Sequence, residues 1–271
     1  MADASSKGWH AWWSRNYVKE FQRTTIIGET MTGIDQYKAI LVDLDGCLIA
    51  GSKVLPGADK LVASASHKLY IVSNNSTDTP DTLSRRLEGL GLSVPPHRII
   101  LAGVLTLERI ADSQPGARIA LYGTTALRDY AISLGLAIDE QAPDLILLAR
   151  DLAFSFDKLS LILRQLHGGA RLVVSNPDLV HPGPNGIPAP ETGAVLAAVK
   201  ACVKDLQYES VGKPAVHLFE SALTRAGVRA EDALFIGDNL ETDGAGARSA
   251  KIAFHHVATG SADLTALTVA D

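Results

Sequence analysis

The sequence predicts an α/β fold built on a doubly wound parallel sheet. Short apolar runs alternate with segments of helical periodicity along most of the chain. This alternation is typical of parallel strands covered by helices. Several of the apolar runs stop at polar residues, the first at Asp43 and Asp45 after the run 39–42. Hydrophobic residues make up 46% of the 271 residues and charged residues 20%, which is ordinary for a globular protein.

Charge and composition exclude several classes of partner. The net charge is -5 and there is no basic stripe, so a nucleic acid is not expected as a partner. Neither an apolar run long enough to cross a bilayer nor a signal-peptide core is found, which argues against a membrane partner. Cys47 and Cys202 lie far apart without the spacing of a metal site, which fits a reducing compartment. We therefore expect a soluble, cytoplasmic protein.

Apolar runs and helix-end signals place the expected elements. Gly91, Gly135 and Gly227 each follow a periodic segment, and the Thr-Pro-Asp start at Thr79 is typical of a helix N-terminus. The segment after the first strand, 49–56, is expected to be a loop. Expected strands are 39–42, 69–72, 118–122, 144–148, 171–174, 208–211, 233–236 and 252–257. Expected helices are 57–66, 79–90, 99–111, 125–134, 155–166, 192–204, 216–226 and 243–249.

Two regions differ from this pattern. Residues 1–36 form an N-terminal extension with Trp9, Trp12 and Trp13 at spacings that fit one helical face. This helix would dock on a partner subunit or pack on the chain's own body; alternatively, an upstream start codon adds residues under no selection. A Pro/Gly-rich segment, 181–190, is the best candidate for a domain boundary.

Polar residues at four strand ends are candidates for one site. They comprise two acids on one strand, a hydroxyl and an amide on a second, a lysine, and two acids after a later strand. In open parallel sheets, ligands bind beyond the carboxyl ends of the strands, so these groups would meet at one edge. Clustered carboxylates suit a hard cation such as Mg²⁺, and lysine with serine suits a phosphate. The residues are Asp43, Asp45, Ser73, Asn74, Lys213, Asp238 and Asp243.

The four motifs resemble those of the haloacid dehalogenase (HAD) superfamily phosphatases. They are Asp-Leu-Asp-Gly-Cys at 43–47, Val-Ser-Asn at 72–74, Val-Gly-Lys-Pro at 211–214, and Gly-Asp-Asn through Thr-Asp at 237–243. The insert between the second and third motifs resembles the α/β C2-type cap of the class IIA branch, which includes nitrophenyl, nucleotide, phosphoglycolate and pyridoxal phosphate phosphatases. The resemblance implies a HAD-like Rossmannoid core at 37–79 and 189–271, with a cap domain at 80–188.

The resemblance also implies a mechanism. Asp43 would attack phosphorus to form an aspartyl-phosphate, and Asp45 would protonate the leaving group and then activate water. Mg²⁺ would bind the carboxylates of Asp43 and Asp238 and the backbone carbonyl of Asp45. Lys213 would balance the charge of Asp43 and of the phosphoryl group.

The remaining site residues have supporting roles in this scheme. Ser73 would bind a phosphate oxygen, with help from backbone N–H groups around Gly46 and Asn74. Asp243, with Asn239 beside it, would orient Lys213 or a metal-bound water. Asp243 could instead cap a helix N-terminus.

Three other side chains carry open alternatives, and two adjacent histidines argue against a further metal site. Cys47 is either an inert buried thiol or an oxidisable one beside the nucleophile. Arg150 either contacts an anionic substrate or forms a surface salt bridge, and His181 could meet the leaving group. His255 and His256 are adjacent, so on a strand they face opposite sides and make a poor metal pair.

The expected activity is Mg²⁺-dependent hydrolysis of small phosphomonoesters. A phosphotransferase using the same intermediate and a non-catalytic metabolite-binding protein are the alternatives. The expected partner is a small phosphorylated metabolite, and the resemblance makes a homodimer through the cap possible. The substrate depends on cap side chains, so pyridoxal phosphate, phosphoglycolate, sugar phosphates and nucleotides all stay open.

Overall fold

The computed structural model describes residues 33–182, 187–259, 264 and 267. These residues all belong to one structural unit of the chain, Gly33–Asp271. The predicted helix around Trp9, Trp12 and Trp13 lies outside the described residues and stays a prediction. Within the described part of the chain, each helix is too short or too polar to span a membrane.

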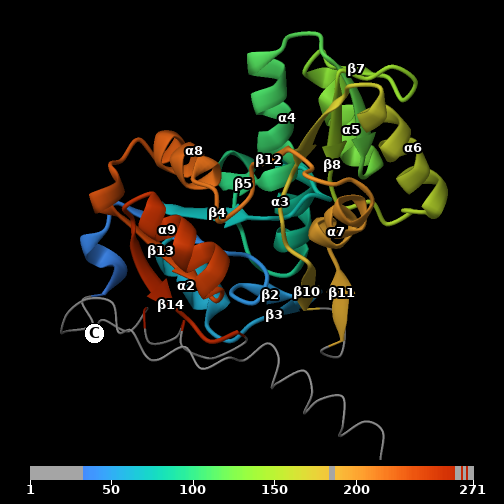
Figure 1. Ribbon diagram of the computed structural model, residues 1–271. Coiled ribbons are helices and arrows are strands. Elements are labelled where there is room, and N and C mark those ends of the chain that lie inside the picture. The colour runs from blue at the N-terminus through green and yellow to red at the C-terminus, as the bar shows by residue number, and fades with distance from the viewer. Residues whose placement is uncertain (1–32, 183–186, 260–263, 265–266, 268–271) are drawn as a thin grey trace, which may run out of the picture. The chain divides into compact units, whose positions relative to one another are not determined.

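The first motif follows the central strand of a five-stranded parallel sheet. The strand order is β14-β13-β1-β4-β5, and each neighbouring pair runs parallel. Figure 1 labels four of these strands: β4, β5, β13 and β14. All four residues of β1 are buried, which explains its uninterrupted apolar sequence. The strands are β1 (Ala39–Val42), β4 (Leu69–Ser73), β5 (Ile99–Leu101), β13 (Ala233–Gly237) and β14 (Ala253–His256).

Helices flank this sheet and complete its core. Thr79 and Thr82 form a reciprocal capping box at the start of α3, as the Thr-Pro-Asp signal predicts. Phe219 of α8 packs on Phe235 of β13 with ring centroids 4.9 Å apart, joining helix to sheet. The helices are α2 (Ala58–Ser64), α3 (Pro80–Gly89), α4 (Ala102–Ser113), α8 (His217–Ala226), the π-helix η5 (Leu240–Gly244) and α9 (Ala245–Ser249). Short 3₁₀ turns are η1 (Ile34–Gln36), η2 (Pro96–Arg98) and η4 (Ala230–Asp232).

A second parallel sheet is formed by the inserted segment. Its order is β12-β9-β8-β6-β7, with each neighbouring pair parallel. The strands are β6 (Arg118–Tyr122), β7 (Ala137–Ile138), β8 (Leu145–Leu148), β9 (Arg171–Val174) and β12 (Tyr208–Ser210). The helices are α5 (Thr125–Ser133), α6 (Phe156–His167) and α7 (Thr192–Cys202), of which α6 and α7 both pack against β8. The two parallel sheets confirm the predicted α/β class with an inserted α/β cap.

Two antiparallel hairpins complete the described elements. One pairs β2 (Ile49–Ala50) with β3 (Lys53–Val54), directly after the first motif. The other pairs β10 (Val180–Pro182) with β11 (Pro188–Pro190), within the Pro/Gly-rich segment. His181 stands opposite Ala189 in this second hairpin. The β10–β11 hairpin connects β9 to α7.

Two local expectations were wrong. Residues 99–111 are not one helix, because Ile99–Leu101 pairs with β4 as strand β5 before α4 begins. A short apolar run before a helix is compatible with either a strand or the first turn of the helix. Here the pairing with β4 makes it a strand. Residues 49–56 contain the β2–β3 hairpin rather than only a loop. The expected helix 243–249 is present, but it begins earlier: the π-helix η5 runs directly into α9, so Asp243 lies inside a helical turn and not at its start.

Sheet membership differs from the predicted cap limits at both ends. Strand β5 belongs to the first sheet, although it falls inside the predicted cap, 80–188. Strand β12 belongs to the second sheet, although it falls inside the predicted second core segment, 189–271. Helix α7 lies in that segment too and packs on α6 of the cap. The domain limits themselves stay a prediction. These pairings would shift both the start and the end of the cap towards the C-terminus of the chain.

Candidate active site

Asp43 and Asp45 follow β1 at the carboxyl edge of the first sheet. The Asp43 backbone N–H donates to the Ile236 carbonyl at 2.9 Å, which continues the β1–β13 pairing into the motif. Gly46 then has φ of +88°, a conformation that favours glycine. A Cβ on Gly46 would lie 2.1 Å from Asp238 Oδ2. Gly46 therefore lets the Asp238 carboxylate lie against the backbone of the first motif.

Lys213 joins two of the predicted acids. Its Nζ lies 2.7 Å from Asp43 Oδ1 and 2.6 Å from Asp243 Oδ1. The lysine side chain is 2% exposed and the Asp243 side chain is fully buried. We call Asp43, Lys213 and Asp243 the Lys213 cluster. A desolvated ammonium between two carboxylates is held in one position, which a flexible surface lysine is not.

Burial and charge oppose each other in the Lys213 cluster. Burial alone would lower the pKa of Lys213, but the carboxylates of Asp243 and Asp43 outweigh it and raise that pKa. Lys213 is therefore a fixed cation. Burial raises the pKa of Asp43, and the nearby Asp243 and Asp238 raise it further against the opposing effect of Lys213. A second cation beside Asp43 would favour its ionised form.

Asp238 brings a further carboxylate next to Asp43. Donor atoms of Asp43, Cys47 and Asp238 all lie within 4.8 Å of one another. Thr259 Oγ1 donates to Asp238 Oδ2 at 2.6 Å and so orients that carboxylate. Burial raises the pKa of Asp238 as well, and the nearby Asp243 raises it further against the opposing effect of Lys213. Two such oxygens fit a hard divalent cation.

Cys47 does not suit the same cation. Its side chain is 2% exposed, and burial followed by the charge of Asp43 raises its thiol pKa well above the usual value. A protonated sulfur is a poor ligand for a hard cation. The geometry therefore favours the inert buried thiol over the oxidisable one, because reactivity needs thiolate and access.

The second motif lies at the end of β4. Ser73 is 2% exposed, and its Oγ accepts from the Asn75 N–H at 3.1 Å, which leaves its O–H available as a donor. The Asn74 side chain is already engaged. Its Oδ1 accepts from the Lys213 N–H at 2.7 Å, and its Nδ2 donates to the Lys213 carbonyl at 3.1 Å and to Asp178 Oδ2 at 2.9 Å. The Asn74 side chain thus ties the Lys213 loop to the second motif, and only its backbone is left for phosphate.

Asn239 and Asp243 have different roles at the start of η5. Asn239 Oδ1 accepts from the N–H groups of Glu241 and Thr242 at 2.9 and 3.2 Å, so Asn239 is the helix cap. Asp243 Oδ2 accepts from the Asn239 N–H at 3.2 Å, while its Oδ1 contacts Lys213. Asp243 is therefore placed to orient Lys213, as one of its two predicted roles requires.

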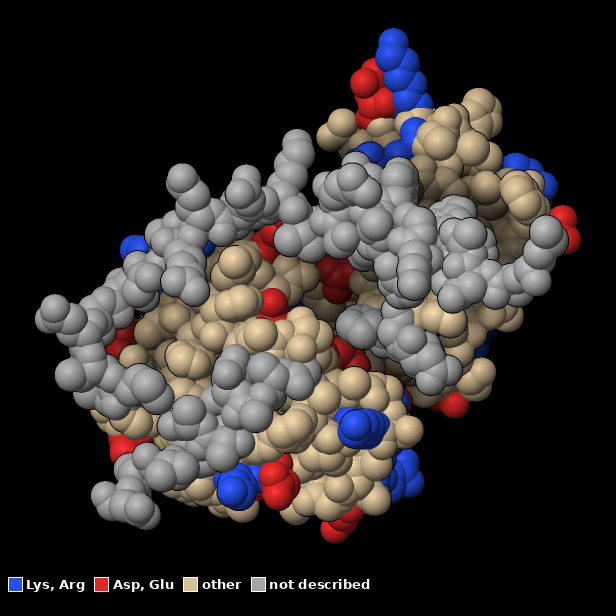
Figure 2. Space-filling view, turned by 90° about the horizontal axis from the view of Figure 1, so that it is seen from below, with Lys and Arg blue, Asp and Glu red and all other residues tan. Residues whose placement is uncertain are grey.

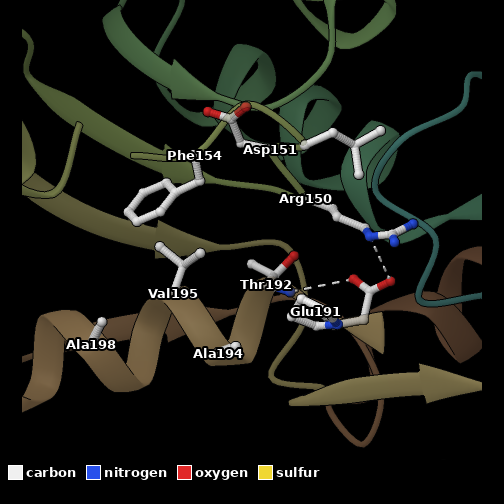
Figure 3. Close-up of a pocket in the computed structure, with 10 residues that line it drawn as sticks. Arg150, Asp151, Phe154, Glu191, Thr192, Ala194, Val195 and Ala198 are labelled. Atoms are coloured by element: carbon white, nitrogen blue, oxygen red, sulfur yellow. Dashed lines mark hydrogen bonds and ion pairs between the residues drawn. The ribbon is translucent and has the colours of Figure 1, made fainter. Parts of the chain in front are cut away.

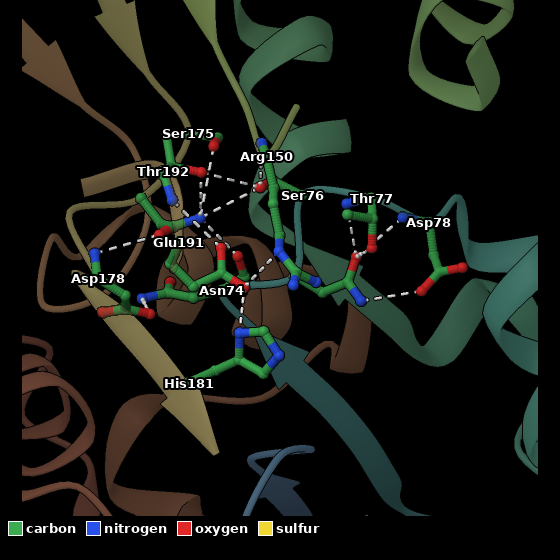
Figure 4. A network of polar contacts seen from close by, with 12 residues as sticks. Asn74, Ser76, Thr77, Asp78, Arg150, Ser175, Asp178, His181, Glu191 and Thr192 are labelled. Atoms are coloured by element: carbon green, nitrogen blue, oxygen red, sulfur yellow. Dashed lines mark hydrogen bonds and ion pairs between the residues drawn. The ribbon is translucent and has the colours of Figure 1, made fainter. Parts of the chain in front are cut away.

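A buried amide connects the second motif to the cap. Asn176 is fully buried, and its Nδ2 donates to the Asn74 carbonyl at 2.9 Å and lies 3.3 Å from Ser76 Oγ and 3.4 Å from Thr192 Oγ1. Figure 4 labels the surrounding Asn74, Ser76 and Thr192. Ser76 Oγ also accepts from the Arg150 backbone N–H at 3.0 Å. Arg150 and Thr192 are thereby fixed against the second-motif loop.

Arg150, His181 and Glu191 meet beside this connection, and we call them the Arg150 cluster. Glu191 Oε1 lies 3.2 Å from Arg150 Nε and 2.9 Å from His181 Nδ1. Burial raises the pKa of Glu191 to about 7, although Arg150 opposes the shift. Burial and the charge of Arg150 lower the pKa of His181. Of the two alternatives for Arg150, the ion pair is present, but its partner is Glu191 and the pair is partly buried.

A cavity of about 500 Å³ opens beside the Arg150 cluster, between the loop after β8 and α7 (Figure 3). Arg150 and Glu191 close one end of it, and Phe154 and Val195 face each other farther along. The walls are mostly apolar, with Asp151 as the other acidic residue. Acidic side chains also lie inside a hollow on the face shown in Figure 2.

The sequence prediction missed three residues of this region. Thr259 lies far from any motif and has no local signal. Glu191 was not singled out, because acidic residues are common at the N-termini of helices and need no functional explanation there. Asn176 stands in the Ser-Asn-Pro-Asp segment at 175–178, shortly before the predicted domain boundary, and the sequence gives no signal for the bonds that its amide makes.

Known proteins agree with this architecture. Family models match residues 40–137, described as haloacid dehalogenase-like hydrolase, and residues 210–270, described as HAD-hydrolase-like; together they cover more than half of the chain. The chain belongs to the haloacid dehalogenase superfamily of phosphatases. It is 32% identical over 206 residues to a dihydroxyacetone phosphatase from Corynebacterium glutamicum, covering 75% of this chain and 74% of that one.

Solved structures of this superfamily have the same fold. A p-nitrophenyl phosphatase from Archaeoglobus fulgidus superposes with a TM-score of 0.77 at 27% identity, covering 83% of this chain and 88% of the other. A glycerol phosphate phosphatase from Mycobacterium tuberculosis, in complex with calcium, gives 0.77 at 27% identity, covering 85% and 69%. The class IIA resemblance and the assignment as a phosphatase are thus confirmed, and the alternative of a non-catalytic binding protein loses its support.

Proposed function

We propose that the protein hydrolyses small phosphomonoesters through an aspartyl-phosphate on Asp43, with Mg²⁺ as its cofactor. The observation that carries the proposal is the Lys213 cluster: a buried lysine 2.7 Å from the Asp43 carboxylate, with Asp238 beside the same carboxylate. A carboxylate surrounded by cationic groups can approach an anionic phosphate with reduced repulsion. No other group of acids among the described residues is placed to hold a metal in this way.

In the first half-reaction, an Asp43 oxygen attacks phosphorus and the bond from phosphorus to the leaving oxygen breaks. Asp45 donates its proton to that oxygen, which leaves as an alcohol. Burial raises the pKa of Asp45, which favours the protonated form needed for this step. Ser73 donates its O–H to a phosphate oxygen, together with the backbone N–H of Asn74. The Gly46 N–H, which was also expected to contact phosphate, instead donates to the Ile49 carbonyl at 2.8 Å. Lys213 balances the charge on the transferred group.

In the second half-reaction, Asp45 accepts a proton from water as the water oxygen attacks phosphorus. The bond from phosphorus to Asp43 breaks and inorganic phosphate is released. Asp45 regains its proton, so the cycle closes. Asp243 acts through its contact with Lys213 and is a positioning residue.

The metal would be held by the carboxylates of Asp43 and Asp238 and by the Asp45 backbone carbonyl. It would offset the negative charge of the phosphoryl group when bound. The adjacent buried acids, their raised pKa values and the space left by Gly46 beside Asp238 support a hard divalent cation. Thr259 would keep the Asp238 carboxylate in place for it.

Nitrophenyl phosphate hydrolysis tests the proposal. We expect turnover with Mg²⁺, loss of turnover with excess chelator, and recovery on adding Mg²⁺ back. Asp238→Asn should need a higher Mg²⁺ concentration for half-maximal rate, whereas Asp232→Asn, a surface acid paired with Lys38, should not. Chelator-resistant turnover would contradict the metal requirement. A new phosphoester formed in the presence of added alcohol would indicate the phosphotransferase alternative.

A further inference from the structure

The Arg150 cluster is fixed close to the place where the leaving group must lie. The Arg150 backbone is bonded to Ser76, three residues after Ser73, and Glu191 immediately precedes Thr192, which contacts the same Ser76 hydroxyl at 3.3 Å. The carboxylate of Asp45, the proposed proton donor to the leaving oxygen, is near enough to Glu191 to raise its pKa. A substrate whose phosphate is bound at Ser73 would therefore extend its leaving group past Asp45 towards Arg150 and Glu191.

Charge around this path does not favour a second anion. The Arg150 guanidinium is already compensated, because Glu191 Oε1 lies 3.2 Å from its Nε. Asp178 is close enough to Glu191 to influence its ionisation, and Asp78 and Arg86 face Asp45 as an ion pair at 3.3 Å. Acidic groups on the path outnumber basic ones. Apart from the reaction centre itself, they are Asp78, Asp178 and Glu191 against Arg86 and Arg150.

Hydrogen-bonding capacity is nevertheless high in the Arg150 cluster. An arginine guanidinium offers several donors in a fixed plane, and the Glu191 carboxylate offers acceptors. The Nε of Arg150 and the Nδ1 of His181 are buried, and neither has hydrogen-bond geometry to any described group despite the short distances to Glu191. Hydroxyl groups both donate and accept hydrogen bonds. They therefore suit a cluster that offers donors and acceptors and whose charges compensate one another.

We propose that Arg150 and Glu191 select phosphomonoesters with an uncharged, hydroxyl-bearing leaving group and reject those with a second anionic group. The inference rests on the proposed phosphatase activity and deepens it. Arg150 donates to hydroxyl or carbonyl oxygens of the leaving group. Glu191 accepts from its hydroxyl groups and repels a carboxylate or second phosphate placed there.

Glu191 can be changed with little disturbance of the fold. Its Oε2 accepts from the Thr192 N–H at 3.3 Å as the N-cap of α7. Glu191→Gln keeps an oxygen for this bond and removes the negative charge, which leaves Arg150 uncompensated. Glu209→Gln is the matched control, since Glu209 is an exposed acid paired only loosely with Arg109 at 3.6 Å.

The test measures kcat/KM with Mg²⁺ for nitrophenyl phosphate, glycerol 3-phosphate and 2-phosphoglycolate. We expect the wild type to prefer glycerol 3-phosphate to 2-phosphoglycolate by about tenfold or more. Glu191→Gln should reduce or reverse this ratio, and Glu209→Gln should leave it unchanged. Arg150→Met should lower kcat/KM for glycerol 3-phosphate by about tenfold relative to nitrophenyl phosphate, whose leaving group has no further hydroxyl.

The possible failures are distinguishable. Absence of turnover with all three esters overturns the proposed function and this inference with it. Turnover of nitrophenyl phosphate combined with equal or better use of 2-phosphoglycolate overturns this inference alone. A preference that Glu191→Gln leaves intact, in a variant with unchanged melting temperature, shows that Glu191 does not set it and also overturns the inference.

Discussion

The Lys213 cluster and the Arg150 cluster are both ion clusters, but they differ in burial and in tightness. The side chains of Lys213 and Asp243 are at most 2% exposed, and their atoms meet at 2.6 Å. The side chains of Arg150 and Glu191 are 24% and 14% exposed, and their atoms meet at 3.2 Å. A fully desolvated pair cannot be rearranged cheaply, whereas a partly hydrated one can exchange partners.

This difference fits a division of work between the two clusters. The Lys213 cluster lies at the carboxyl edge of the first sheet and is proposed to act on the phosphoryl group, which is the same in every substrate. The Arg150 cluster lies on the cap and its hairpin and is proposed to contact the leaving group, which varies. Changes in the first cluster should therefore affect all substrates alike, and changes in the second should affect them unequally.

The largest effect is expected for Asp43→Asn. Removing the nucleophilic carboxylate should lower kcat by roughly 10⁴-fold or more for every phosphomonoester. Steady-state assays of nitrophenyl phosphate and glycerol 3-phosphate, with circular dichroism to verify folding, would measure this. Asp35→Asn, in the short turn η1, is the control. A loss of activity restricted to one of the two substrates would show that Asp43 is not the nucleophile for both.

Lys213→Met tests how strongly the Lys213 cluster depends on its cation. Leaving Asp43 and Asp243 without their cation should lower the free energy of unfolding by about 3–5 kcal/mol. Activity should fall on all substrates, by roughly 10²- to 10³-fold. Chemical denaturation and kinetics measure the two effects.

A second buried lysine provides the comparison for that variant. Lys68 is 9% exposed, and its Nζ donates to the carbonyls of Ile34 and Tyr37 at 3.0 and 2.9 Å. Lys68→Met should cost about 1–3 kcal/mol, because two carbonyl bonds are lost but no carboxylate is left without a counter-charge. Equal destabilisation by both substitutions would argue against a special role for the ion pairs of Lys213.

Much of the Lys213 cluster could be predicted from the sequence, because four short motifs at strand ends bring its members to one sheet edge. The Arg150 cluster could be predicted only in part. Arg150 and His181 stood out as single side chains, but their shared partner Glu191 depends on how the β10–β11 hairpin faces the loop after β8. Asn74 shows the same limit within the motifs. Its position was predicted, yet its side chain is occupied by Lys213 and Asp178.

The fold could be predicted where local and tertiary preferences agree. The buried strand β1 and the capped helix α3 begin and end close to the predicted residues. Strand β5 was missed because its three apolar residues run directly into α4, and only pairing with β4 makes them extended. The limits of the cap depend on such strand pairings. The spacing of motifs along the sequence was therefore not enough to predict them.

Thr259→Val should give a smaller effect, limited to the metal. The valine keeps the shape but loses the hydroxyl that donates to Asp238 Oδ2 at 2.6 Å. Mg²⁺ affinity should fall by about tenfold, measured by titration calorimetry on the protein without substrate. Thr224→Val, on the exposed face of α8, is the control. Unchanged affinity would mean that Thr259 does not orient Asp238 for the ion.

The smallest effect is expected from pH and belongs to the Arg150 cluster. The pKa of Glu191 is about 7, so Glu191 is largely neutral at pH 6 and ionised at pH 8. The groups that face it are Arg150, His181, Asp178 and Asp45. Since ionised Glu191 repels a second anion, the preference for glycerol 3-phosphate over 2-phosphoglycolate should rise between pH 6 and pH 8, by roughly three- to tenfold.

Taking the ratio of the two substrates cancels the titration of Asp45, which acts on both. The two phosphate groups titrate differently, so the change in the ratio is compared with that in Glu191→Gln, where it should be much smaller. A pH dependence that persists undiminished in Glu191→Gln would have to come from another group, such as His181, and would contradict the role given to Glu191.

Trapping of the intermediate tests the division between the clusters most directly. Wild type and Arg150→Met would be mixed with nitrophenyl phosphate and Mg²⁺, quenched, and treated with borohydride, which reduces an acyl phosphate to the alcohol. Peptide mass spectrometry should find homoserine at position 43 in both proteins, because phosphoryl transfer does not involve Arg150. Turnover without modification at Asp43, or modification at a different carboxylate, would contradict the proposed mechanism.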